Sequence, residues 1–144
     1  MKIYLDNCCY NRPFDDQSQS RIQMESLAVL YVLMEAEKGR HIILGSDILD
    51  YEIGRQTLPD RKIKATLLAS IASEHIDLTD DIRAMANGYV QTSNLHSMDS
   101  LHLASAESAH ADYLLTVDDK FVGNANTLGT NVTVMNPVNF LLSQ

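Results

Sequence analysis

Short apolar runs alternate with longer amphipathic segments along this chain, and this alternation constrains the fold more than any other feature of the sequence. Four runs have the length and apolar content of strands, at 2–5, 41–44, 113–117 and 131–135, and residues 75–78 could add a short fifth one. Helical patterns fill most of the chain between them. Strands that alternate with helices build a parallel sheet covered by helices. The sequence therefore predicts a three-layer α/β/α sandwich with a central parallel sheet of four or five strands.

The longest helical segment lies between the first two strands. Ser20 and Gln23 have the spacing of a capping box, and Gly39 ends the pattern. An apolar stripe typical of a helix packed on a core runs along it. The stripe consists of Ile22, Met24, Leu27, Leu30, Tyr31 and Met34.

Other helices are expected further along the chain. Ser46, Thr79 and Ser97 are suited to cap three of them. A helix is also expected at 60–73, after Pro59 interrupts the preceding one, and a short final helix begins at Pro137. Residues 11–16 are polar and are expected to form a loop.

Length and composition fit one domain that spans residues 1–144. A chain of this length with 45% hydrophobic residues can bury a core of ordinary size. Its apolar runs are far shorter than the ~20 residues of a membrane helix, and it opens without the basic and then apolar pattern of a signal peptide. We expect a cytoplasmic protein that does not enter a membrane.

The two cysteines, Cys8 and Cys9, are adjacent and are the only ones in the chain. Neighbouring cysteines close only a strained ring, and a structural zinc site needs a second pair of ligands. We expect reduced, buried thiols with a packing role.

The net charge is −8, from 11 basic and 19 acidic residues. This balance argues against a protein that coats nucleic acid through its overall field. A local exception is the segment with Arg55, Arg61, Lys62 and Lys64, in which Asp60 is the only acid. The segment is either a solvated helix face or a surface that steers an RNA backbone.

Four acidic residues stand where the strands leave the sheet. Asp6 follows the first strand, Asp118 follows the strand at 113–117, Glu52 lies in the helix after the second strand, and Asp99 lies in the first turn of its helix. In an open parallel sheet the functional crevice lies at the carboxyl ends of the strands. Each acid alone could be a turn or helix-start residue, but their joint placement predicts one acidic site.

Carboxylates packed together without a cation repel one another and take up protons. A divalent metal removes that conflict, and Mg²⁺ and Mn²⁺ prefer carboxylate and phosphate oxygens. Such ions lower the pKa of a bound water and stabilise the attacking and leaving oxygens of a phosphodiester. The pattern therefore favours hydrolysis of a nucleic-acid backbone.

The segments IYLDN, SDILDYEIGR, MDSLHLASAESAHADYLLT and VDDKF resemble the ordered acidic motifs of the PIN-domain ribonucleases, which include the VapC-type toxins. The resemblance covers essentially the whole chain. It implies an endoribonuclease that uses Mg²⁺ or Mn²⁺ to hydrolyse RNA and leaves a 5′-phosphate. It also implies a homodimer and, for a toxin, an antitoxin protein as partner.

The resemblance assigns roles to individual residues. The metal-binding and catalytic acids that it implies are Asp6, Glu52, Asp99 and Asp118. Thr116 and Asn7 match positions that support the site in the family. Within SDILDYEIGR, the resemblance favours Glu52 over Asp47 and Asp50, because the family usually has a Glu followed by an apolar residue, here Ile53; Asp50 is the alternative.

Some roles remain open at the level of the sequence. The T-x-D spacing selects Asp118 over Asp119, and Phe121 is expected in the core. His102 shares a helix face with Asp99, so it is either a packed, hydrogen-bonded histidine or one that orients a carboxylate. For the whole chain, a catalytically inactive PIN-like module that binds RNA or protein is the alternative to the enzyme. A phospho-acceptor domain of receiver type is disfavoured because no lysine follows the last strand.

Overall fold

The computed structural model describes residues 1–144 and contains one five-stranded sheet in which every neighbouring pair is parallel. The strand order is β3-β2-β1-β4-β5. The strands are β1 Lys2–Leu5, β2 Ile42–Ser46, β3 Glu74–Ile76, β4 Tyr113–Leu115 and β5 Thr133–Met135. The predicted α/β/α sandwich with a parallel sheet is confirmed.

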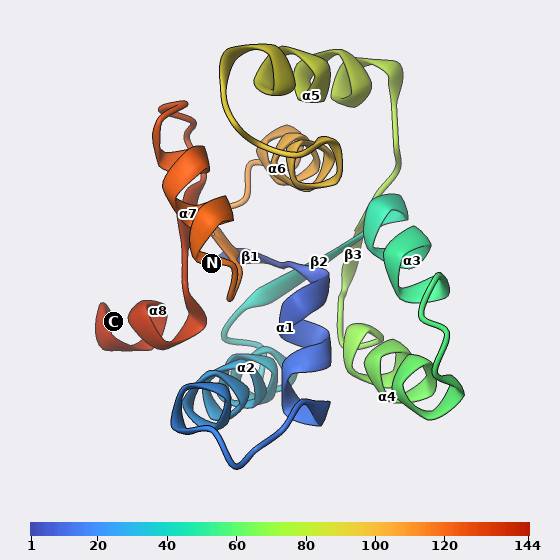
Figure 1. Cartoon of the computed structure of the whole chain (residues 1–144), viewed down its shortest axis with the longest axis vertical. Helices are drawn as coiled ribbons and strands as arrows, with labels where there is room; N and C mark the ends of the chain where they lie inside the picture. Colours follow the sequence, from blue (N-terminus) through green and yellow to red (C-terminus); the bar gives the residue numbers. More distant parts are fainter.

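Helices cover both faces of the sheet (Figure 1). On one face lie α2, α4 and α8, and on the other lie α5 and α6, which pack closely against each other. The helices are α1 Asn7–Asn11, α2 Ser20–Glu37, α3 Asp47–Gly54, α4 Pro59–Ala69, α5 Asp80–Thr92, α6 Ser97–Ser108, α7 Asp119–Asn126 and α8 Pro137–Leu142, with a 3₁₀ turn, η1, at Arg12–Phe14. No helix has both the length and the apolar character that crossing a membrane requires.

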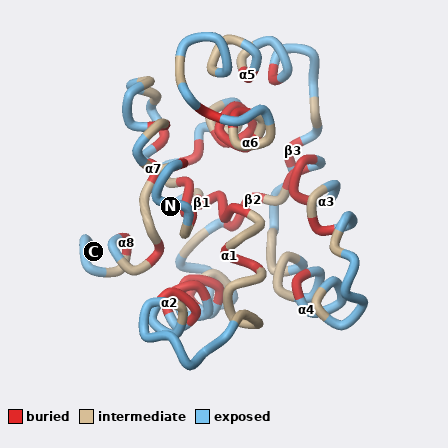
Figure 2. Tube along the Cα trace, in the orientation of Figure 1, coloured by how far each residue is buried: buried red, intermediate tan, exposed pale blue.

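The core is centred on β1, the middle strand. Ile3, Tyr4 and Leu5 are fully buried, which suits a strand with helices on both faces. Buried residues concentrate in the sheet and on the inward sides of the helices (Figure 2). Phe121 of α7 is also buried, as its sequence context predicts.

The topology creates a switch point beside β1. From β1 the chain moves outward to β2 and β3, and it then returns to the opposite side of β1 to form β4 and β5. Leu5 pairs with Leu115, and the Asp6 N–H donates to the Leu115 carbonyl oxygen at 2.9 Å. Residues that leave β1 and β4 therefore enter the crevice where ligands bind in open α/β sheets.

The predicted capping box and buried face of α2 are wrong, although the helix does begin at Ser20. Its N-cap is Gln19, which makes no side-chain capping bond, so Ser20 and Gln23 form no capping box. Most of the predicted stripe is exposed; Leu27, for example, is 64% exposed. The buried face instead contains Val29, Val32 and Leu33 together with the acidic residues Glu25 and Glu35. These two carboxylates are buried because arginines pair with them, a long-range effect that the apolar pattern does not reveal.

Other boundaries differ by smaller amounts. The expected loop at 11–16 contains η1, and α1 precedes it; the sequence analysis also missed α7. Both helices are short, so they show little periodicity. Pro59 is the first residue of α4, which ends at Ala69 rather than at residue 73. Ser46 and Thr79 are confirmed as N-caps, whereas His96 occupies the position predicted for Ser97.

Candidate functional site

The crevice at the switch point holds a cavity of about 440 Å³. Its lining includes all four carboxylates predicted to form one site: Asp6, Glu52, Asp99 and Asp118. They come from the end of β1 and from α3, α6 and the start of α7. Four distant segments of the chain therefore place acidic side chains around one space.

Asp6 is held most firmly, and its side chain is almost entirely buried. Its Oδ1 accepts the N–H of Asn7 at 2.7 Å, which caps α1. Its Oδ2 accepts the hydroxyl of Thr116 at 2.8 Å and the thiol of Cys8 at 3.2 Å. These bonds fix the orientation of the carboxylate.

Thr116 connects Asp6 to Asp118. Its Oγ1 donates to Asp6 and accepts the N–H of Asp118 at 3.2 Å. Oδ1 of Asp118 then accepts the N–H groups of Lys120 and Phe121, which caps α7. Thr116 is fully buried, so this connection is protected from water.

Glu52 is held by His102. Nε2 of His102 donates to Oε1 of Glu52 and lies 3.6 Å from Oδ1 of Asp6. Burial opposes protonation of His102, but the hydrogen bond to Glu52 and the negative charge of Asp6 hold its pKa above the ordinary value. The fully buried position agrees with the packed, hydrogen-bonded histidine considered from the sequence.

The four acids are not equally close. One potential ligand atom each from Asp6, Glu52 and His102 lies within 4.8 Å of the other two, and Asp99 and Asp118 stand outside this tight set. Asp99 is half-buried, and burial together with the negative charges of Asp6 and Asp118 raises its pKa to about 6. The negative charges of Asp6 and Asp118 therefore act on the Asp99 carboxylate, although Asp99 lies outside the tight set.

The donor set fits a hard divalent cation. Oxygen atoms dominate it, and after burial the negative charges of Asp6 and Asp118 are the next causes of the raised pKa of Asp99. Mg²⁺ and Mn²⁺ are bound by a few carboxylates while water and phosphate complete the shell. The cavity of about 440 Å³ that the four acids line has space for such additional ligands.

Several polar residues of the cavity wall were missed by the sequence analysis. Cys8, Asn11, Asp15 and Gln56 line the cavity. Hydrogen bonding with Cys9 and burial hold the pKa of Cys8 well above its usual range, so its thiol remains a donor to Asp6. The available signal was proximity in the sequence, because Cys8 and Asn11 lie in the short helix after Asp6, and Gln56 follows Glu52 closely.

The four basic residues predicted to act as one segment have different surroundings in the structure. Only Arg61 lines the cavity, where it donates to Asp15 at 2.7 Å and to the Phe14 carbonyl oxygen at 2.6 Å. The exposed residues are Arg55, which lies over the ring of Tyr51, Lys64, which lies over the ring of Phe14, and Lys62.

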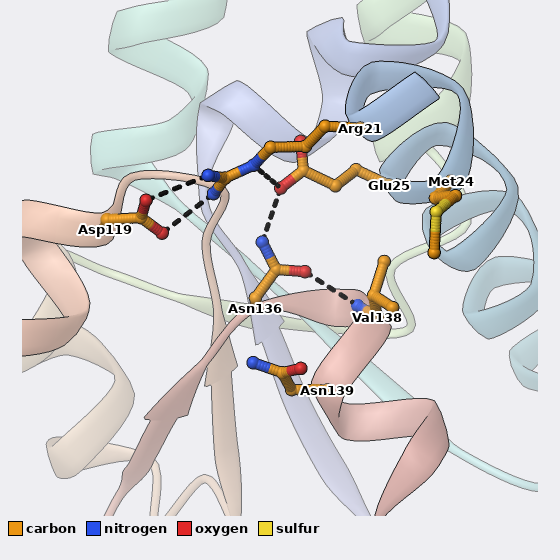
Figure 3. Close-up of a pocket in the computed structure, with 7 residues that line it drawn as sticks. All are labelled: Arg21, Met24, Glu25, Asp119, Asn136, Val138 and Asn139. Atoms are coloured by element: carbon orange, nitrogen blue, oxygen red, sulfur yellow. Dashed lines mark hydrogen bonds and ion pairs between the residues drawn. The ribbon is translucent and has the colours of Figure 1, made fainter. Parts of the chain in front are cut away.

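Asp119, the alternative to Asp118, points into a different pocket (Figure 3). Both of its oxygens accept from Arg21, at 2.8 and 2.9 Å. Arg21 also donates to Glu25, which accepts the amide of Asn136 as well. Asp119 is thus neutralised by an ion pair outside the acidic cavity.

Asp50, the alternative to Glu52, is also outside the cavity. It is exposed and lies 4.0 Å from His75. His75 belongs to a second group with Asp47 and Asp77, in which one potential ligand atom per residue lies within 4.8 Å of the others. All three residues of this second acidic group are exposed.

No protein-family model matches this chain, and no curated protein matches its sequence. Among solved structures, it is similar to the crystal structure of VapBC2 from Rickettsia felis bound to a DNA fragment from their promoter. The TM-score is 0.62 with 16% sequence identity, over 94% of this chain and 98% of that chain. At this identity the likeness shows the fold alone, and it supports the PIN-like fold expected from the sequence.

Proposed function

We propose that this chain is a metal-dependent endoribonuclease of the PIN-domain type, which hydrolyses RNA phosphodiester bonds. The observation that carries the proposal is the convergence of Asp6, Glu52, Asp99 and Asp118 on one cavity at the switch point of the sheet. The likeness to a VapBC2 structure agrees with it at the level of the fold.

In this proposal the four carboxylates hold one or two Mg²⁺ or Mn²⁺ ions. When bound, such an ion lowers the pKa of water and stabilises charge that develops on the phosphate oxygens. Thr116 and Asn7 support the site by fixing Asp6, and Thr116 also fixes the backbone of Asp118. The protein contributes a set of oxygens whose orientation is established before the substrate arrives.

Arg61 is the basic residue best placed to contact the RNA backbone. It lines the acidic cavity and uses only part of its donor capacity on Asp15 and Phe14. Arg55, Lys62 and Lys64 lie on nearby exposed surface and would extend this contact. Local basic side chains are needed because the net charge of −8 repels RNA as a whole.

A toxin–antitoxin role is the finer form of the proposal. The similar structure contains a VapBC2 complex on promoter DNA, and the sequence resembles VapC-type toxins. We therefore propose an antitoxin protein as a partner of this chain.

The homodimer that the resemblance implies is proposed to form through the exposed face of α2, which we call the α2 stripe. The α2 stripe consists of Met24, Leu27, Leu30, Tyr31 and Met34, all more than 40% exposed. Because α2 is also apolar on its buried face, it has the character of a helix covered on all sides.

The spacing of the α2 stripe suits a second copy of the same helix. The intervals between positions 24, 27, 31 and 34 are the same from either end. A two-fold axis near position 29 would therefore set Met24 of one copy against Met34 of the other, and Leu27 against Tyr31. Such self-complementarity is the requirement for an isologous dimer.

The nuclease is tested by single carboxylate substitutions assayed on labelled RNA with Mn²⁺. Asp6→Asn or Asp99→Asn is expected to reduce cleavage about a thousandfold, because metal binding supplies several kcal/mol of transition-state stabilisation. Asp50→Asn is the matched control, since this acid lies outside the cavity. Circular dichroism confirms that each variant is folded.

The assay also separates the enzyme from the alternative, a PIN-like module that binds RNA or protein without cutting. A binding module would yield no Mn²⁺-dependent products from the wild-type chain. Cleavage at the wild-type rate by purified Asp6→Asn would show that the assigned site is wrong.

A further inference from the structure

A chain of hydrogen bonds runs through the core of the molecule and ends at the acidic cavity. The Tyr4 hydroxyl lies 2.7 Å from Oγ of Ser46 and 2.6 Å from Nδ1 of His102. Nε2 of His102 bonds Glu52. Ser46, Tyr4 and His102 are each 0% exposed, so only Glu52 reaches the cavity.

The carboxylate at one end fixes the position of one hydrogen in this series of bonds. Nε2 of His102 faces a carboxylate oxygen, which only accepts, so Nε2 carries the hydrogen. Nδ1 of the same ring pairs with the Tyr4 hydroxyl, as the acceptor when the ring is neutral and as the donor when it is protonated. Burial raises the pKa of Tyr4 well above its ordinary value, so that hydroxyl keeps its proton.

The last link is Ser46. Its Oγ accepts the N–H of Leu49 at 3.0 Å and also bonds the Tyr4 hydroxyl. Ser46, Tyr4 and His102 are therefore linked in series to Glu52, and each hydroxyl and ring nitrogen of these three residues has a partner.

Geometry assigns a role to His102. Its Nε2 is close enough to Asp6 and Glu52 to count among potential metal ligands, but it already bonds Glu52, and its ring is fully buried outside the lining of the cavity. We propose that Tyr4 and His102 are positioning residues, which hold the Glu52 carboxylate toward the cavity. This inference rests on the proposed function, in which Glu52 is one of the carboxylates that hold the metal.

The arrangement also fixes α3 as a unit. Ser46 caps the start of α3, and Glu52 lies near its end. Ser46 is hydrogen-bonded to Tyr4 of β1, and Glu52 is hydrogen-bonded to His102 of α6, which in turn bonds Tyr4. Rotation of α3 would break bonds at both ends, so the position of Glu52 is coupled to the centre of the sheet.

Packing alone does not require these polar groups. Burial of a hydroxyl or an imidazole costs free energy unless its bonds are satisfied, and apolar side chains of similar size would fill the same volume without that cost. The neighbouring Tyr10 illustrates the difference, because it is equally buried but its hydroxyl has no hydrogen-bond partner. Only Tyr4 is connected to the cavity.

The contrast between the two tyrosines supplies the experiment. Tyr4→Phe and Tyr10→Phe each remove one oxygen from a fully buried ring. Mn²⁺ affinity is measured by titration calorimetry, and folding is checked by thermal unfolding. Tyr4→Phe is expected to weaken Mn²⁺ binding about tenfold, as loss of an outer-shell partner does, whereas Tyr10→Phe is expected to leave the affinity unchanged.

A second pair of variants separates positioning from direct ligation. His102→Gln retains an N–H group that can donate to Glu52, whereas His102→Leu retains none. A positioning role predicts that His102→Gln binds Mn²⁺ more tightly than His102→Leu. Equal losses in both would identify His102 as a ligand and overturn the proposal.

The outcomes also distinguish this inference from the proposed function. Wild-type protein that binds no Mn²⁺ would refute the metal site and the positioning role together. Wild-type protein that binds Mn²⁺ with equal affinity in Tyr4→Phe and Tyr10→Phe would leave the metal site standing and refute the role of Tyr4.

Discussion

Asp99 shows most clearly how the cavity acts on a single residue. Its pKa of about 6 results from burial and from the charges of Asp6 and Asp118. In the unfolded chain the pKa of an aspartate is about 3.9. Ionised Asp99 therefore destabilises the metal-free fold at neutral pH, and a bound cation would remove this cost.

The pH dependence of stability follows from this difference. Between the two pKa values the folded protein binds more protons than the unfolded one, so the contribution of Asp99 to stability falls as pH rises. Metal-free protein is expected to gain about 1 kcal/mol from Asp99 between pH 7 and pH 4, after allowance for solvent screening. The gain is measured by urea unfolding as the difference between wild type and Asp99→Asn, which removes the contributions of the other groups. A difference that does not change with pH would contradict the assignment.

The residues that could be foreseen were those whose position along the chain determines their place in space. Asp6 and Asp118 directly follow β1 and β4, so the end of a strand was enough to locate them. The partners that hold them were harder to predict. Arg61 and Asp15 are 46 positions apart and meet only through the packing of α4 beside α1, which no local pattern encodes.

At the scale of elements, α2 shows where the pattern of apolar residues misleads. Apolar residues occur on both of its faces, and buried Glu25 and Glu35 interrupt the inner one. The sequence pattern therefore predicted that the outer face, which contains the α2 stripe, would be the buried one. N-caps were predicted correctly where the cap side chain accepts a backbone N–H, as with Ser46 and Thr79. They were predicted wrongly at Gln19 and His96, whose side chains make no capping bond.

The α2 stripe leads to a prediction about the dimer. Leu27→Glu is expected to convert a dimer into a monomer, because a charge would be buried at the centre of the interface. Leu67→Glu on α4 is the matched control, since Leu67 and Leu27 are both 64% exposed. Sedimentation velocity measures the mass of each variant. A wild-type monomer at micromolar concentration, or a Leu27→Glu dimer, would refute the proposed interface.

At the scale of the whole molecule, the alternation of strands and helices was sufficient to predict the sandwich. The switch point beside β1 then explains why acids far apart in sequence share one cavity. The distances within the cavity were beyond the sequence, because they depend on side-chain bonds such as those that draw Glu52 to His102. The folded chain has two groups of residues whose spacing could suit a metal ion, the one around Asp6 and the exposed one around His75.

The most direct test of the metal site is paramagnetic broadening of amide NMR signals during titration with Mn²⁺. We predict that the amides of Asn7, Asp99 and Asp118 lose more intensity at the first additions of Mn²⁺ than those of His75 and Asp77, because broadening falls steeply with distance from the ion. A larger early loss at His75 and Asp77 than around Asp6 would place the metal in the exposed group and contradict the account.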